Sequence, residues 1–136
     1  MPLMTWNDRM SVGVAEIDVE HKRLVAMLND LYDGIQSGRG KEALGKTLDG
    51  LVAYTGNHFQ HEERLFVQTG YPAAVAHKLE HETLVTQVLE IQAKYKAGAT
   101  EVLSLEVMGF LKTWLAQHIM GSDRKYGPHF NSKGIH

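Results

Sequence analysis

The chain has 136 residues, with 14 lysine and arginine side chains against 16 acidic ones and a formal net charge of −2. This length suits one domain with a single hydrophobic core, and the nearly balanced charge disfavours binding to nucleic acid or to an anionic membrane surface. The absence of cysteine excludes disulfides, thiolate catalysis, iron–sulfur clusters and thiolate zinc sites, so any metal must be held by nitrogen and oxygen.

The first residues, 1–17, lack the pattern of a signal peptide, and no stretch of the chain approaches the roughly 20 consecutive apolar residues of a membrane span. We therefore expect a soluble, cytoplasmic protein made of one domain, 1–136. The segment 1–17 is expected to form an N-terminal arm. The 3 prolines leave long windows in which helices can form.

Two amphipathic helices are expected first, over about 18–37 and 41–68, because apolar residues recur there at steps of three and four. Asp18 is the expected N-cap of the first helix, which the glycines at 37–40 end, and Gly70 ends the second. The expected buried stripes are Ile17, His21, Leu24, Leu28, Leu31 and Ile35, and then Leu44, Leu48, Leu51, Thr55, His58, Glu62 and Leu65.

Two further helices are expected over about 71–97 and 100–120. Pro72 falls in the first turn of the third helix, where proline is tolerated, and Gly98 ends that helix, while Thr100 is the expected cap of the fourth. The expected buried stripes are His77, His81, Leu84, Val88, Ile91 and Tyr95, and then Leu103, Val107, Phe110, Trp114 and His118.

The last segment, 121–136, is expected to be a tail without regular structure, because glycines and a proline interrupt it. Its His129 and His136 are expected to be solvated. Four helices of similar length joined by short connections predict an all-α fold, an antiparallel up-down-up-down four-helix bundle.

Each of the four stripes also carries polar side chains. In an antiparallel bundle the start of the first helix, the end of the second, the start of the third and the end of the fourth lie at the same end. Burying so many polar groups without partners costs several kcal/mol each, so a shared metal centre is the natural explanation. The residues that converge are His21, His58, Glu62, His77, His81 and His118.

Asp123 is the further carboxylate expected at this centre. A five-residue offset from His118 turns a side chain about 140° away in a continuous α-helix, so Gly121 is expected to break the helix and bring Asp123 back. One six-coordinate ion cannot accept all these donors, which implies two ions. With both carboxylates and one oxo or hydroxo group as bridges, one coordination position stays open. Such donors suit iron, manganese, cobalt or zinc.

The segments GVAEIDVEHKRL at 13–24, HFQHEE at 58–63, GYPAAVAHKLEH at 70–81 and HIMGSD at 118–123 together resemble the hemerythrin family, specifically its single-domain bacterial members. The resemblance implies two iron ions with an oxo or hydroxo bridge. One ion would be held by His77, His81 and His118 and the other by His21 and His58. Glu62 and Asp123 would bridge the two ions.

The resemblance also implies reversible dioxygen binding at the open position, for carriage, storage or delivery, and a non-enzymatic role. An apolar dioxygen pocket would be lined by Leu24, Phe59, Trp114, Leu115 and Ile119. The alternatives are a dioxygen-consuming oxidase or peroxidase, and the sensing or handling of dioxygen, nitric oxide or iron. The expected partners are dioxygen and a dioxygen-consuming enzyme as recipient, and the expected state is a monomer. His61, beside the stripe of its helix, is expected to face solvent or to neighbour a ligand.

Overall fold

The computed structural model describes residues 3–98 and 101–136, and the side chains within these ranges apart from those of 101–105. The expected cap Thr100 and the expected core side chain of Leu103 lie outside the described residues. The elements are η1 (Asp8–Met10), α1 (Ala15–Gln36), α2 (Gly40–Thr69), α3 (Ala74–Lys96), α4 (Glu101–Gln117), η2 (His118–Asp123) and α5 (Arg124–Ser132).

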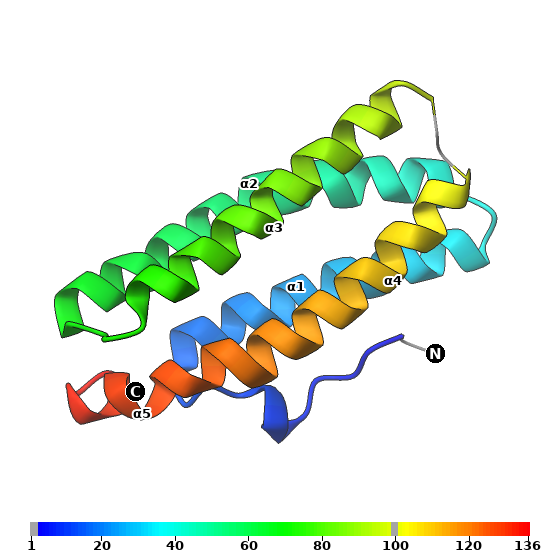
Figure 1. Cartoon of the computed structure of the whole chain (residues 1–136). Helices are drawn as coiled ribbons and strands as arrows, with labels where there is room; N and C mark the ends of the chain where they lie inside the picture. Colours follow the sequence, from blue (N-terminus) through cyan, green and yellow to red (C-terminus); the bar gives the residue numbers. More distant parts are fainter. Residues whose placement is uncertain (1–2, 99–100) are drawn as a thin grey trace.

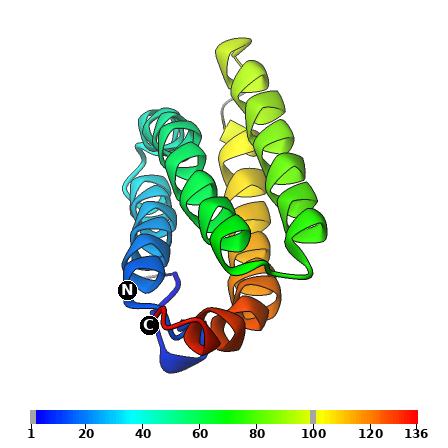
Figure 2. The same ribbon diagram turned by 90° about the vertical axis from the view of Figure 1, so that its left-hand side faces the viewer.

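The four long helices form a bundle in which each helix runs antiparallel to the one before it (Figure 1). Helix α1 packs against α2 and α4, and α2 also packs against α3. A second view shows the N-terminal arm and α5 together at the lower end of the bundle (Figure 2). The described residues contain no strand. The predicted all-α, up-down-up-down four-helix bundle is confirmed.

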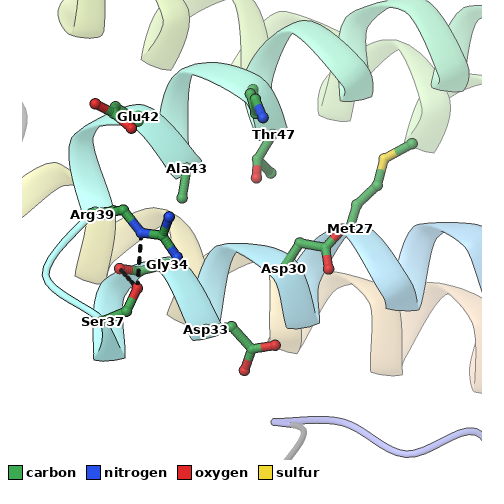
Figure 3. A pocket seen from close by; sticks show the side chains of 10 residues that line it. Met27, Asp30, Asp33, Gly34, Ser37, Arg39, Glu42, Ala43 and Thr47 are labelled. Atoms are coloured by element: carbon green, nitrogen blue, oxygen red, sulfur yellow. Dashed lines mark hydrogen bonds between the residues drawn. The ribbon is translucent and has the colours of Figure 1, made fainter.

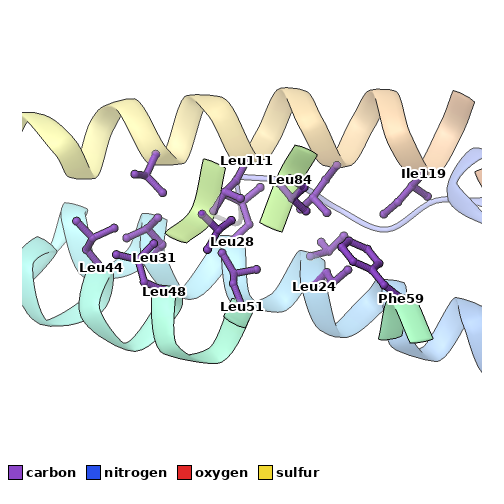
Figure 4. Packing of buried hydrophobic residues seen from close by; sticks show 14 of the residues in the cluster. Leu24, Leu28, Leu31, Leu44, Leu48, Leu51, Phe59, Leu84, Leu111 and Ile119 are labelled. Carbon is purple, nitrogen blue, oxygen red and sulfur yellow. The ribbon is translucent and has the colours of Figure 1, made fainter. Parts of the chain in front are cut away.

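The core of the bundle consists mainly of leucine side chains from the four long helices (Figure 4). Complete burial of each contributes about 1.5–3 kcal/mol. In α4, the buried side chains are those of Val107, Leu111 and Leu115, whereas Phe110 and Trp114 are only partly buried. The expected stripe of this helix is therefore right at Val107 and His118. It is one residue early at Phe110 and Trp114, where the next residues, Leu111 and Leu115, face the core instead.

The N-terminal arm is attached to the first turn of α1 by Asp18. This residue was expected to be the N-cap, but α1 begins at Ala15, with Val14 at the cap position. The Asp18 carboxylate instead accepts a hydrogen bond of 2.6 Å from the Ser11 hydroxyl and one of 2.9 Å from the Val12 amide. Asp18 therefore stabilises the turn of the arm, which packs Val12 and Val14 into a small core at this end.

The C-terminal segment corrects the expectation of an irregular tail, because Arg124–Ser132 forms helix α5 with Pro128 inside it. Tyr126 and Phe130 are fully buried in the small core at this end, against Phe66 of α2. Helix α5 continues directly from η2, so it avoids the cost of nucleation. Burial of Tyr126 and Phe130 stabilises α5, and the helix needs no separate nucleation. The glycine and proline in this segment therefore do not prevent a helix, although they predicted an irregular tail.

Gly127 allows the arm and α5 to cross in close contact. A Cβ atom at this position would lie 2.0 Å from the Val12 carbonyl oxygen, which no side chain tolerates. The side-chain amide of Asn131 donates a 3.0 Å hydrogen bond to the carbonyl of Gly13 beside this crossing. The arm and α5 therefore form one closing layer over this end of the bundle.

The opposite end of the bundle contains a pocket of about 500 Å³ between the end of α1 and the start of α2 (Figure 3). Its charges are mixed, with Asp30, Asp33 and Glu42 beside Arg39 and Lys46. This pocket lies away from the histidine-bearing end. No helix among residues 3–98 and 101–136 is long and apolar enough to span a membrane.

Candidate metal centre

The histidines and carboxylates of the apolar seams meet at one end of the bundle. In each of two groups of side chains, one possible metal-binding atom per residue lies within 4.8 Å of those of the other members. Glu62 and Asp123 belong to both groups. Every member is between 0% and 4% exposed. One group is Glu62, His77, His81, His118 and Asp123, and the other is His21, His58, Glu62 and Asp123.

Asp123 lies between histidines of three helical segments. Its Oδ1 is 2.7 Å from Nε2 of His77 and 2.9 Å from Nε2 of His118. Its Oδ2 is 2.9 Å from Nε2 of His21. The two oxygens therefore face opposite groups of imidazoles, which is the arrangement that a bridging carboxylate needs.

Glu62 occupies the equivalent position from α2. Its Oε1 is 3.0 Å from Nε2 of His81 and 3.5 Å from Nε2 of His58, and its Oε2 is 3.7 Å from Nε2 of His21. Glu62, like Asp123, thus contacts imidazoles of both groups. The two carboxylates form the centre of the cluster, and the histidines surround them.

Many of these atoms are buried without a hydrogen bond. Among the described residues, no hydrogen bond of regular geometry is made by Nε2 of His21, His77, His81 and His118, by Oε1 of Glu62 or by either oxygen of Asp123, and these atoms face one another as imidazole–carboxylate pairs. Each such group costs about 1–3 kcal/mol when it is left unsatisfied. Nitrogen and oxygen lone pairs that converge within 4.8 Å need a cation between them. The residues therefore fit bound metal ions, and the mixed imidazole and carboxylate set suits a transition metal.

The electrostatics of the cluster favour cations. Burial alone would lower the pKa of His21, but the carboxylates of Asp123 and Glu62 outweigh it and raise that pKa to about 10. Burial would raise the pKa of Asp123, but His118, His21 and His77 hold it well below its usual range. Burial and the charge of Asp123 would raise the pKa of Glu62, but the imidazoles that contact it lower this pKa overall, so both carboxylates stay ionised in the metal-free chain. The raised pKa values of His21 and His118 mean that these two imidazoles hold protons that a metal ion would displace.

Asp123 reaches the cluster through η2, a π-helix that spans His118–Asp123. The amide of Arg124 donates to the carbonyl of Ile119, five residues earlier. Because hydrogen bonds in a π-helix join residues five apart, side chains at this offset return to nearly the same face. Gly121 was expected to break the helix, but the helix continues through it as a wider turn. The expected position of Asp123 is right, although the expected mechanism is wrong.

An outer ring of acids orients the histidines. The Nδ1 atom of His58 donates to Glu20 Oε1 at 2.6 Å, and Nδ1 of His81 donates to Glu63 Oε2 at 3.2 Å. A histidine that donates through Nδ1 presents a bare Nε2 lone pair to a metal. Burial would raise the pKa of Glu20, but hydrogen bonds from His58 and His61 lower it overall, so this carboxylate remains an acceptor.

Tyr126 fixes one oxygen of the Glu62 carboxylate. Its hydroxyl donates a hydrogen bond to Glu62 Oε2, and its side chain is fully buried. Sequence reasoning missed Tyr126, Glu20 and Glu63. The available signals were weak: Glu20 and Glu63 are immediate neighbours of expected ligands, and Tyr126 follows Asp123 by three residues.

The residues expected to line an apolar pocket lie on the core side of the cluster. The ring of Phe59 stacks on that of His81 with centroids 3.8 Å apart, and Trp114 stacks on His118 at 4.3 Å. Leu24, Leu115 and Ile119 are buried in the same core cluster as Phe59, and Figure 4 shows Leu24, Phe59 and Ile119 near one end of it. Trp114 is partly buried, packs against this core and also lines a surface groove beside His118.

The three remaining histidines differ in their surroundings. The Nδ1 atom of His61 lies 2.7 Å from Glu20 Oε2, so His61 neighbours the outer ring of acids. His136 is exposed, as expected. His129 is not freely solvated, which corrects the expectation for it, because its Nε2 donates to the Thr69 carbonyl at 2.9 Å. The formation of α5 places His129 beside the end of α2.

Comparisons with known proteins agree with this architecture. A family model described as the hemerythrin HHE cation binding domain matches residues 12–130. A bacteriohemerythrin of Stenotrophomonas maltophilia is 38% identical over 126 residues, which cover 93% of this chain and 80% of the relative. One of Methylococcus capsulatus is 38% identical over 129 residues, or 94% of this chain and 97% of the relative. The crystal structure of a wild-type hemerythrin matches with a TM-score of 0.83 and 37% identity, covering 93% of this chain and 96% of the other. The chain therefore belongs to the hemerythrin family.

Proposed function

We propose that this protein binds dioxygen reversibly at a di-iron centre and serves in dioxygen carriage, storage or delivery. The observation that carries this proposal is the pair of buried ligand groups that share Glu62 and Asp123. One buried group alone would suit a single ion. Two groups with two carboxylates in common suit two ions that are bridged.

The donors divide unequally between the two proposed ions. His77, His81 and His118 would hold one ion, and His21 and His58 would hold the other. The ion with two histidines then has one fewer protein donor and an open coordination position. Two bound iron ions would supply the electrons and the open position that reversible dioxygen binding requires.

The surrounding chain supports binding over catalysis. The rings of Phe59 and Trp114 stack against two of the proposed ligands, and Leu24, Leu115 and Ile119 bury further apolar surface in the same core. Such surroundings exclude water, so protons from solvent would reach the centre slowly. Slow proton delivery favours release of dioxygen over its consumption.

The test is a cycle of oxygenation with the purified, iron-loaded protein. We would measure iron per chain, reduce the protein under argon, admit dioxygen while recording the visible spectrum, and flush with argon again. A visible band that appears and disappears over several cycles supports the proposal. A band that decays irreversibly while dioxygen is consumed would instead indicate an oxidase or peroxidase. His136→Ala, which changes an exposed histidine, is the control and should cycle like the wild type.

A further inference from the structure

We propose that His61 is a positioning residue for the two-histidine metal position, and that it acts through Glu20 on the ring of His58. This inference rests on the proposed di-iron centre. His61 itself is not a metal ligand here, because its side chain is 23% exposed and belongs to neither ligand group. It sits one turn after His58 on the flank of α2, facing α1.

Glu20 is shared between the two histidines. Its Oε1 accepts from Nδ1 of His58 at 2.6 Å, and its Oε2 accepts from Nδ1 of His61 at 2.7 Å. Because an ionised carboxylate only accepts hydrogen bonds, both imidazoles donate through Nδ1. The Nε2 atom of His58 is then free of hydrogen and faces the seam, while Nε2 of His61 lies 3.5 Å from Glu16 Oε2. A ladder of alternating acids and imidazoles thus joins α1 to α2.

The other outer acids are held differently. Glu63 contacts His81 at 3.2 Å with one oxygen, and its other oxygen lies 4.0 Å from the exposed amine of Lys78. Glu80 lies 3.9 Å from His118 and accepts from the hydroxyl of Ser122. Among the described outer acids, Glu20 is therefore the one with an imidazole on each oxygen. This double attachment serves the metal position that has only two histidines.

Glu20 needs a second attachment because it lies at a groove. The groove, of about 630 Å³, is lined by Glu20, His58 and His61 and also by Arg23 and Arg64. The Glu20 side chain is 22% exposed. Without His61, the carboxylate is free to turn toward solvent or toward either arginine. His58 would then lose the acceptor that fixes its tautomer and ring orientation.

The expected consequence is specific to one metal ion. Loss of an outer hydrogen-bond partner commonly weakens metal binding by about 10–100-fold. His61 contacts Glu20 and not His58 itself, so its effect should lie at the low end of that range. We expect His61→Leu to speed the loss of one of the two irons to a ferrous chelator by about tenfold. The second iron, at the three-histidine position, should be released at the wild-type rate.

Two further variants of His61 distinguish the loss of its hydrogen bond to Glu20 from the change in side-chain size. The side-chain nitrogen of asparagine takes the place of histidine Nδ1, whereas that of glutamine takes the place of Nε2. His61→Asn should therefore restore slow iron release, and His61→Gln should not. Asn57→Leu is the matched control, because Asn57 lines the same groove and stands outside the ladder.

The experiment follows chelator-driven iron release from the loaded protein, together with the Mössbauer spectrum of the two iron positions and the stability of each metal-free variant. Faster release of one iron in His61→Leu, with rescue by His61→Asn and unchanged metal-free stability, supports the proposal. Wild-type release from His61→Leu, equal acceleration for both irons, or failure of His61→Asn to rescue would overturn it. A wild-type protein without two irons per chain would refute the proposed function itself, a result distinct from these.

Discussion

The hydrogen bond from Tyr126 to the Glu62 carboxylate can be tested by removing one oxygen atom. In Tyr126→Phe the ring keeps its contacts with Phe130, at 4.5 Å between centroids, and with Phe66 and His77, at 5.5 Å each. The substitution leaves no cavity larger than a hydroxyl group. Glu62 Oε2, in a side chain that is 0% exposed, loses its donor.

The size of the effect follows from the charge of the acceptor. A hydrogen bond to a charged group contributes about 1.5–3 kcal/mol, and the buried oxygen cannot replace its lost partner with bulk water. We therefore expect the metal-free protein to lose about 2 kcal/mol of unfolding free energy. For a chain of 136 residues this corresponds to a fall in Tm of roughly 8 °C.

The assay is urea unfolding of metal-free wild type and Tyr126→Phe, followed by circular dichroism. Tyr71→Phe is the matched control, because Tyr71 packs on the same aromatic group but is only partly buried. Its change should stay within about 0.5 kcal/mol. Equal stability of Tyr126→Phe and wild type would refute the argument, since it would mean that the hydroxyl contributes nothing to holding Glu62.

Three further changes probe the centre itself. His118→Ala should sharply reduce iron occupancy, because it removes one of three nitrogens from one proposed ion; two irons per chain by metal analysis would contradict that assignment. Leu115→Tyr should speed the irreversible decay of the dioxygen-dependent band while iron is retained, and an unchanged decay rate would place Leu115 outside the pocket. The raised pKa of His21, from 6.5 to about 10, stabilises the metal-free fold fully below pH 6.5, and this contribution is lost as the pH rises toward 10. Urea unfolding of the metal-free protein should therefore show that the free energy of unfolding falls more between pH 6 and pH 10 for wild type than for His21→Leu. An equal fall in both proteins would argue against a charged His21.

Sequence reasoning grouped the candidate ligands because two regularities coincide in them. Apolar residues that recur with a period of 3.6 mark the inward face of each helix. The antiparallel topology then places His21, the end of the second stripe and the start of the third at the same end of the bundle. Leu31 and Leu44, both fully buried, follow the same pattern at the opposite end, where the expected stripes carry no histidine or acidic residue. The contrast between an apolar end and a polar end of one seam is what made a metal centre predictable.

The features that sequence reasoning missed depend on contacts between distant residues. Glu20 reaches His58 across 38 positions, and Tyr126 reaches Glu62 across 64. A helical pattern reports only neighbours three or four residues apart, so it cannot identify these partners. The π-helix at His118 is similar, since no residue type in the segment HIMGSD marks its wider turn.

The closing layer made by the arm and α5 has a physical purpose that follows from the cost of the cluster. Burying so many imidazoles and carboxylates carries a desolvation cost in the metal-free chain, and water entering this end would lower that cost at the expense of the apolar surroundings. Aromatic rings border the cluster on two sides, with Phe66 4.9 Å from the ring of His77 and Phe59 3.8 Å from that of His81. Tyr126 and Phe130 join Phe66 to the closing layer. Asp123 and the aromatic side chains that cover it thus lie on one continuous helical segment, so the same segment positions a candidate ligand and keeps its surroundings apolar.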